Sequence, residues 1–354
     1  MSPPVDSPPT EFFRLGDFPL ENGQVLVDAK VAYNKYGELN SERSNAIVFP
    51  TWFVGSNKDS EWLIGPGRAL DTDEYCVIVP HMFGNSVSTS PSNASDQQRG
   101  PNFPRIDIRD NVRAQHELVV GHIGVREIQL VIGGSMGAFQ AYQWALSHPD
   151  IVRRFAACCG ASRVSGHCYV FLEGVKAALL ADEHYVNGAF AAKPERGLRA
   201  VGRVYAGWGL SQSFYAERRY EDLGFSSIEG FLVGFWEEFF LGVDPQDMLS
   251  QVQTWQHADL ALTPGYNGDI DRALGSIEVP GLLMPAARDL YFPAYDMEAE
   301  AAKQKLTSVS VIPGVWGHLS ESGLDEACSM MLAEQIRVFL NQGWVKTRKE
   351  YQHG

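Results

Sequence analysis

A short glycine-rich segment carries the residue with the clearest chemical potential. Gly133, Ser135 and Gly137 form a Gly-x-Ser-x-Gly pattern. An apolar run, 129–132, precedes the pattern, and an amphipathic stretch, 137–147, follows it. In a sharp turn between a buried strand and a helix, flanking glycines let neighbouring backbone approach, and the serine Oγ projects over the helix N-terminus. The pattern therefore predicts a nucleophilic serine, and the alternative is a glycine-rich turn with a capping serine.

A nucleophilic serine needs a base, and the base needs an acid that orients it. Asp289 lies just past an apolar run, 279–285, where its carboxylate can reach an imidazole. His318 follows the next apolar run, 308–313, and precedes the final predicted helix. We therefore predict that Asp289 is the acid and His318 the base. The alternatives are an ion pair of Asp289 with Arg288 and a helix-capping or merely exposed histidine.

The reaction also needs backbone donors for the developing oxyanion. We expect one donor to be the N–H of Met136, directly after the serine. The other should come from the loop after the apolar run 45–49, with Trp52 as the first choice and Phe53 as the second. Losing one such donor typically costs about 3–4 kcal/mol of transition-state stabilisation. His81 precedes the serine in the sequence and is the alternative base.

Aromatic side chains are expected around the mouth of this site. Such walls suit an apolar or flat acyl group. Ordinary core packing is the alternative for each of them. The predicted substrate-binding residues are Phe53, Phe139, Trp208, Tyr291 and Trp316.

The elements that must position these residues alternate between strand and helix. Helical periodicity is found at 107–124, 137–147 and 324–341. Continuous apolar runs suit parallel strands that are buried on both faces. The alternation therefore predicts an α/β fold with a mainly parallel sheet flanked by helices. The predicted strands are 24–36, 45–52, 76–83, 127–133, 155–159, 279–285 and 308–313.

One block, 165–272, breaks the alternation because it contains no convincing strand. Helices inserted late between two strands of a sheet are typical of a cap or lid. We therefore divide the chain into a first part of the core, 1–164, a helical lid, 165–272, and a second part of the core, 273–354. The helices predicted in the lid are 170–182, 196–206, 228–241 and 245–258.

The amino-acid composition limits the classes of function that this protein can have. The 354 residues include 29 Lys and Arg against 43 Asp and Glu, a formal net charge of −14, which disfavours nucleic acid and membrane surfaces as partners. A secretory signal and an apolar stretch of about 18 residues are both absent from the sequence, so we expect a cytoplasmic protein. The five cysteines are scattered, and the His, Asp and Glu residues lack metal-ligand spacing. We therefore predict neither a metal nor a cofactor.

Several segments together carry a resemblance to a known family. These segments are 31–37, 63–73, 103–104, 108–115 and 131–137. From about Gly23 to Phe339, the chain resembles the homoserine O-acetyltransferase family of the α/β-hydrolase superfamily. The resemblance implies an α/β-hydrolase fold with an inserted helical lid and allows a homodimer formed through the lid. It places the nucleophile, acid and base on Ser135, Asp289 and His318, in agreement with the choice made from the residues alone.

Three departures from the family pattern bear on function. The family typically has His-Ala-Leu-Thr-Gly where this chain has 50–54, and His-Asp-Ala-Phe where it has His318-Leu319-Ser320-Glu321. Near the start of the lid, the family's Thr-Tyr-Arg-Ser corresponds to 208–211, so Leu210 replaces the arginine. In the family that arginine lies near the acceptor site, and an amino-acid acceptor needs a cation for its carboxylate.

We therefore predict a serine hydrolase that cleaves a small carboxylic ester or amide through an acyl-enzyme on Ser135. The alternative is an O-acyltransferase that resembles homoserine O-acetyltransferase and moves an acyl group from acyl-CoA to an alcohol. A third possibility is a protein of the hydrolase fold that only binds a ligand. The expected partner in the first case is a small-molecule substrate.

Overall fold

Short apolar runs form the strands of one sheet in the computed structural model, which describes residues 7–342. The eight strands have the order β1-β2-β4-β3-β5-β6-β9-β10. β2 pairs antiparallel with both of its neighbours, and the remaining pairs are parallel, as predicted. The strands are β1 (Glu11–Pro19), β2 (Val25–Tyr36), β3 (Ala46–Val48), β4 (Cys76–Pro80), β5 (Ile128–Gly134), β6 (Phe155–Cys158), β9 (Gly281–Met284) and β10 (Thr307–Val309).

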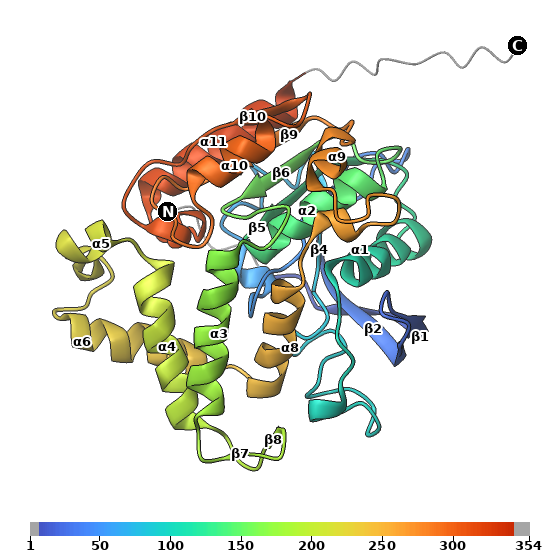
Figure 1. Ribbon diagram of the computed structural model, residues 1–354. Coiled ribbons are helices and arrows are strands. Elements are labelled where there is room, and N and C mark those ends of the chain that lie inside the picture. The colour runs from blue at the N-terminus through green and yellow to red at the C-terminus, as the bar shows by residue number, and fades with distance from the viewer. Residues whose placement is uncertain (1–6, 343–354) are drawn as a thin grey trace, which may run out of the picture.

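Helices cover both faces of the sheet because alternate side chains of its central strands face opposite sides (Figure 1). In β4, Val77 and Val79 belong to one apolar cluster, and Cys76 and Ile78 belong to the other. We call the cluster with Val77 the first cluster and the cluster with Cys76 the second cluster. Helix α11 packs on the first cluster, and the second cluster is covered mainly by α1, α2, α9 and α10. Their bounds are α1 (Ile108–His116), α2 (Met136–Ser147), α9 (Ile270–Gly275), α10 (Ala294–Ala301) and α11 (Glu326–Asn341).

A block of helices is inserted between β6 and β9, where the sequence predicts a lid. These helices gather below the sheet in Figure 1 and add their apolar side chains to the first cluster. The division at 164/165 and 272/273 stays a prediction. The helices are α3 (Gly166–Leu180), α4 (Glu195–Gly209), α5 (Gln212–Ala216), α6 (Ile228–Phe231), α7 (Glu238–Leu241) and α8 (Pro245–Gln256).

Three details differ from the sequence-based expectation. The block contains a small hairpin, β7 (Tyr185–Val186) with β8 (Ala189–Phe190), whose two-residue strands are too short to give a pattern. β1 was not expected, because most of its side chains are exposed and its apolar signal is weak. The predicted strand 45–52 is a strand only over β3, and its remainder forms a loop. Residues 1–6 and 343–354 lie outside the described residues.

Candidate active site

Ser135 occupies the tight turn between β5 and α2, so the predicted strand–turn–helix is present. Its φ of 51° and ψ of −121° are seldom adopted by residues other than glycine. The turn is crowded, because a Cβ on Gly133 would lie 2.0 Å from the carbonyl oxygen of Gly137. A Cβ on Gly137 would lie 3.1 Å from the carbonyl oxygen of Pro50. Close backbone approach therefore requires glycine at position 133, whereas at position 137 the approach is tight but less severe.

The structure brings the three predicted catalytic side chains together. His318 Nε2 lies 3.0 Å from Ser135 Oγ, and His318 Nδ1 lies 2.8 Å from Asp289 Oδ2. The other oxygen of Asp289 accepts the backbone N–H groups of Tyr291 and Phe292 at 2.8 and 3.1 Å. A carboxylate on Nδ1 favours the tautomer with its proton there, so that Nε2 can accept the serine proton. The arrangement can therefore perform nucleophilic catalysis.

The alternative partners are engaged elsewhere. His81 is buried, with Nε2 2.8 Å from Asn34 Oδ1 and Nδ1 3.1 Å from Asn85 Nδ2. Burial lowers the pKa of His81 to about 4, which suits a neutral ring held by two amides. Arg288 donates a hydrogen bond to the hydroxyl of Ser213, which lies in the inserted block.

The predicted oxyanion donors come from the residue after the serine and from the loop after β3, whose Trp52 and Phe53 line the same cavity as Ser135. Met136 is the first residue of α2, a position whose N–H has no acceptor within the helix. In the loop after β3, the N–H groups of Thr51 and Val54 already donate to a backbone carbonyl and a side-chain amide. Trp52 and Phe53 lie between them. Met136 with Trp52, or with Phe53 as second choice, stays the prediction for this role.

A cavity of about 310 Å³ opens beside Ser135 and His318, and its walls are mainly aromatic. Among the sequence-predicted residues, Trp52, Phe53 and Tyr291 line it. The inserted block supplies further walls that sequence reasoning missed, although the dense aromatic segment 235–240 was a signal. The missed residues are Tyr205, Phe235, Trp236, Phe239, Phe240 and Trp255.

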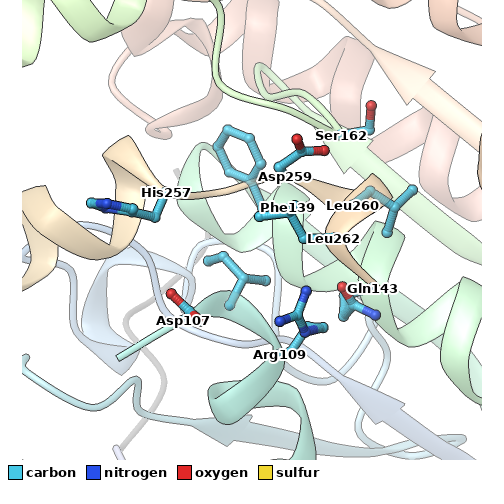
Figure 2. Close-up of a pocket in the computed structure, with 10 residues that line it drawn as sticks. Asp107, Arg109, Phe139, Gln143, Ser162, His257, Asp259, Leu260 and Leu262 are labelled. Carbon is cyan, nitrogen blue, oxygen red and sulfur yellow. The ribbon is translucent and has the colours of Figure 1, made fainter. Parts of the chain in front are cut away.

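Phe139, Trp208 and Trp316, predicted to bind substrate, lie outside the residues that line this cavity. Phe139 packs against Phe292 and lines a separate small pocket (Figure 2). Trp208 lies parallel to the Tyr291 ring with centroids 6.5 Å apart, and Trp316 packs edge-on against a buried phenylalanine. Position along the chain does not determine which way a side chain points, so residues predicted near the site need not line its cavity. A role of these three rings in substrate binding stays a prediction.

One carboxyl that was not predicted as a site residue lies next to the imidazole. Glu321 Oε1 is 3.7 Å from His318 Nε2, and the side chain lines the cavity. Burial and the nearby Asp289 carboxylate raise the pKa of Glu321 well above its ordinary value. The sequence held a signal, because Glu321 is three residues after the base, inside a segment that departs from the family pattern.

The five cysteines, all within the described part of the chain, are buried and free. Across residues 7–342, His, Cys, Asp and Glu side chains do not gather in threes that could hold a metal ion. Over the same residues, the helices are too short or too polar to cross a bilayer.

Comparison with known proteins agrees with the fold. Residues 47–319 match the family described as the alpha/beta hydrolase fold. The ethyl acetate hydrolase of Pseudomonas veronii is 36% identical over 320 residues, which cover 90% of this chain and 91% of that protein. A homoserine O-acetyltransferase of Trichormus variabilis is 31% identical over 307 residues, with coverages of 82% and 83%.

Comparison with solved structures also identifies an esterase. The acetyl esterase MekB superimposes with a TM-score of 0.91 at 34% identity, over 94% of this chain and 96% of that one. The resemblance to homoserine O-acetyltransferases is thereby confirmed, and esterases stand beside them among the relatives. The chain is an enzyme and belongs to the α/β-hydrolase fold family.

Proposed function

We propose that this protein is a serine hydrolase that cleaves a small, uncharged carboxylic ester through an acyl-enzyme on Ser135, with an amide as the second substrate class. The observation that supports the proposal most is the hydrogen-bonded series from Ser135 Oγ to His318 Nε2, at 3.0 Å, and from His318 Nδ1 to Asp289 Oδ2, at 2.8 Å. This is the geometry that makes a serine hydroxyl nucleophilic near neutral pH.

The reaction proceeds in two halves. Ser135 Oγ attacks the ester carbonyl carbon while its proton passes to His318 Nε2. The N–H groups of Met136 and Trp52 hold the oxyanion. The C–O bond to the leaving alcohol then breaks, and the alcohol takes the proton from Nε2. Water attacks the resulting acyl-enzyme, with His318 again as the base.

The charge of the cavity favours an ester over the substrates of acyl transfer. Among the described residues that line it, Asp59 and Glu321 are acidic, and neither lysine nor arginine occurs. Homoserine carries a carboxylate and coenzyme A carries phosphates, and both groups need cationic partners. Leu210, at the family's arginine position, is itself buried. The relatives named as ester hydrolases support the same choice.

A three-part assay tests this function. A fluorophosphonate should label Ser135 stoichiometrically, and the label should be absent in Ser135→Ala. p-Nitrophenyl acetate should be hydrolysed with a transient mass increase of one acetyl group on the labelled peptide. Acetyl-CoA with homoserine should release CoA no faster than acetyl-CoA alone. Rapid CoA release only with homoserine would overturn the hydrolase assignment, and failure to label would favour a binding protein.

The inserted block is the proposed lid, 165–272, and the proposed surface of a homodimer. Its aromatic side chains form one wall of the cavity, so a substrate must pass beside it. Light scattering on the purified protein at micromolar concentration should give the mass of two chains. A mass of one chain, 39.2 kDa, would contradict the dimer without affecting the hydrolase assignment.

A further inference from the structure

We propose that Glu321 positions the water that hydrolyses the acyl-enzyme and thereby directs the acyl group to water rather than to another alcohol. This inference rests on the proposed esterase function and assigns to that reaction a positioning residue beyond the Ser–His–Asp series.

The place of Glu321 follows from the short helical segment Gly317–Glu321, which also carries the base. Oε1 of Glu321 lies 3.7 Å from His318 Nε2. Nε2 takes the serine proton in the first half of the reaction and must take a water proton in the second. A water about 2.8 Å from each of two acceptors can bridge them when they are 3.7 Å apart. The attacking water can therefore donate one hydrogen to Nε2 and the other to Oε1.

Contacts of the second carboxyl oxygen place Glu321 against the nucleophile's own turn. A Cβ on Gly134, the residue before Ser135, would lie 2.4 Å from Glu321 Oε2. Oε2 is buried, and within the described residues it accepts no hydrogen bond. Burying a polar atom without a hydrogen-bond partner destabilises a fold. Fold stability therefore does not account for a carboxyl at this position.

The charge state of Glu321 agrees with a positioning role. Burial and the carboxylate of Asp289 raise the pKa of Glu321, which favours the protonated carboxyl. A neutral carboxyl still offers its carbonyl oxygen to water. It does not add a second negative charge beside His318, so the imidazole can remain unprotonated and act as the base.

The step balances without proton transfer to Glu321. The water oxygen bonds to the acyl carbon as one water proton moves to Nε2. The bond from the acyl carbon to Ser135 Oγ then breaks, and Oγ takes the proton back from Nε2. A carboxylic acid leaves, and the serine is free. Throughout, Glu321 holds the second water hydrogen and fixes the direction of attack.

Glu321→Met tests the inference, because it keeps the length of the side chain and removes the acceptor. The substrate is p-nitrophenyl acetate, with methanol as a competing acceptor. The burst of p-nitrophenol, which reports acylation, should change by less than about threefold, while steady-state deacylation should fall about 10- to 100-fold because the attacking water is misplaced. The ratio of methyl acetate to acetate should rise by a similar factor. Glu321→Gln retains a carbonyl oxygen and should therefore recover most of the deacylation rate and of the product ratio that Glu321→Met loses.

Glu334→Met is the matched control, because it removes a carboxyl that is ion-paired with Arg337 on the surface of α11. Its burst, deacylation rate and product ratio should equal those of the unaltered enzyme. Equal losses in acylation and deacylation for Glu321→Met, or an unchanged product ratio, would overturn the inference. If Glu321→Met does not fold, the product ratio of Glu321→Ala decides in the same way. An unaltered enzyme that forms no acyl-enzyme would instead defeat the proposed function.

Discussion

At the scale of single residues, reactivity depends on which atoms of His318 are engaged. Asp289 accepts from Nδ1 and is itself held by two backbone N–H groups, so the imidazole has one orientation and one tautomer. Nε2 is thereby directed at the Ser135 hydroxyl. The Ser135 backbone is strained, and its hydroxyl makes no capping hydrogen bond to α2.

Replacing either reacting side chain should therefore remove activity without unfolding the protein. Ser135→Ala and His318→Ala should each lower kcat/KM for p-nitrophenyl acetate by on the order of 10⁴-fold or more, because nucleophile and base act as a unit. The double variant should be no worse than either single variant. Circular dichroism and the melting temperature should match those of the unaltered protein. Near-normal activity of His318→Ala would place the base elsewhere.

At the scale of elements, the same substitution should have different effects at two neighbouring glycines, Gly133 and Gly134, beside the turn between β5 and α2. An added Cβ at Gly133 would meet the backbone of Gly137, which belongs to α2 and cannot move alone. An added Cβ at Gly134 would meet the carboxyl end of the Glu321 side chain. The same glycine-to-alanine substitution therefore meets rigid backbone at position 133 and a flexible side chain at position 134.

We expect Gly133→Ala to lose about 3 kcal/mol or more of unfolding free energy, or to fail to fold, because overpacking against backbone is costly. Gly134→Ala should lose less than about 1 kcal/mol, because a side-chain end can rotate away. Urea unfolding monitored by tryptophan fluorescence measures both. Equal losses for the two variants would show that the turn, and not the specific contact, limits stability.

At the scale of the whole molecule, the chain has a formal net charge of −14, and the cavity is lined by the acidic Asp59 and, among the described residues, by neither lysine nor arginine. Such a field repels anionic substrates and is screened by salt. Two histidines, the buried His81 and the half-buried His148, add a second property of the whole molecule. Burial lowers the pKa of both His81 and His148 to about 4, so the folded protein resists charging them.

A neutral ester should be preferred over an anionic ester of similar size. We expect the kcat/KM of the neutral p-nitrophenyl valerate to exceed that of the monoanionic p-nitrophenyl succinate, whose acyl group has a similar length, by about tenfold or more in low salt. The ratio should narrow when the ionic strength rises from about 0.01 to 0.5 M, because the Debye length shortens. A ratio that is independent of salt would mean that shape, not charge, makes the distinction.

Stability should fall as the pH drops from about 6.5 to 4. Below pH 6.5 an unfolded chain protonates His81, whereas the folded state does so only near pH 4, its pKa there. Proton binding thus favours unfolding across this window by up to about 3 kcal/mol, since one pKa unit corresponds to about 1.4 kcal/mol. His81→Gln should flatten the dependence of the unfolding free energy on pH, and the exposed His122→Gln should not. If the unfolding free energy depended on pH with the same slope in both variants, protonation of His81 would not be the cause of that dependence.

The sequence by itself determined the parts of this protein that local physics controls. Only small residues fit around Ser135, and continuous apolar runs must be buried on both faces, so the turn and the mainly parallel sheet could be predicted. The chain order of Ser135, Asp289 and His318, together with their positions just after predicted strands, selected three side chains that the structure places in hydrogen-bond contact.

The tertiary structure alone decided which other side chains face the cavity. Phe139 and Trp316 pack away from it, whereas Phe239 and Trp255 reach it from inserted helices. Glu321 lies beside the imidazole because a short helical turn directs it there. Side-chain direction depends on how helices pack against the sheet, and that depends on contacts between residues far apart in the chain. Local sequence patterns do not contain this information.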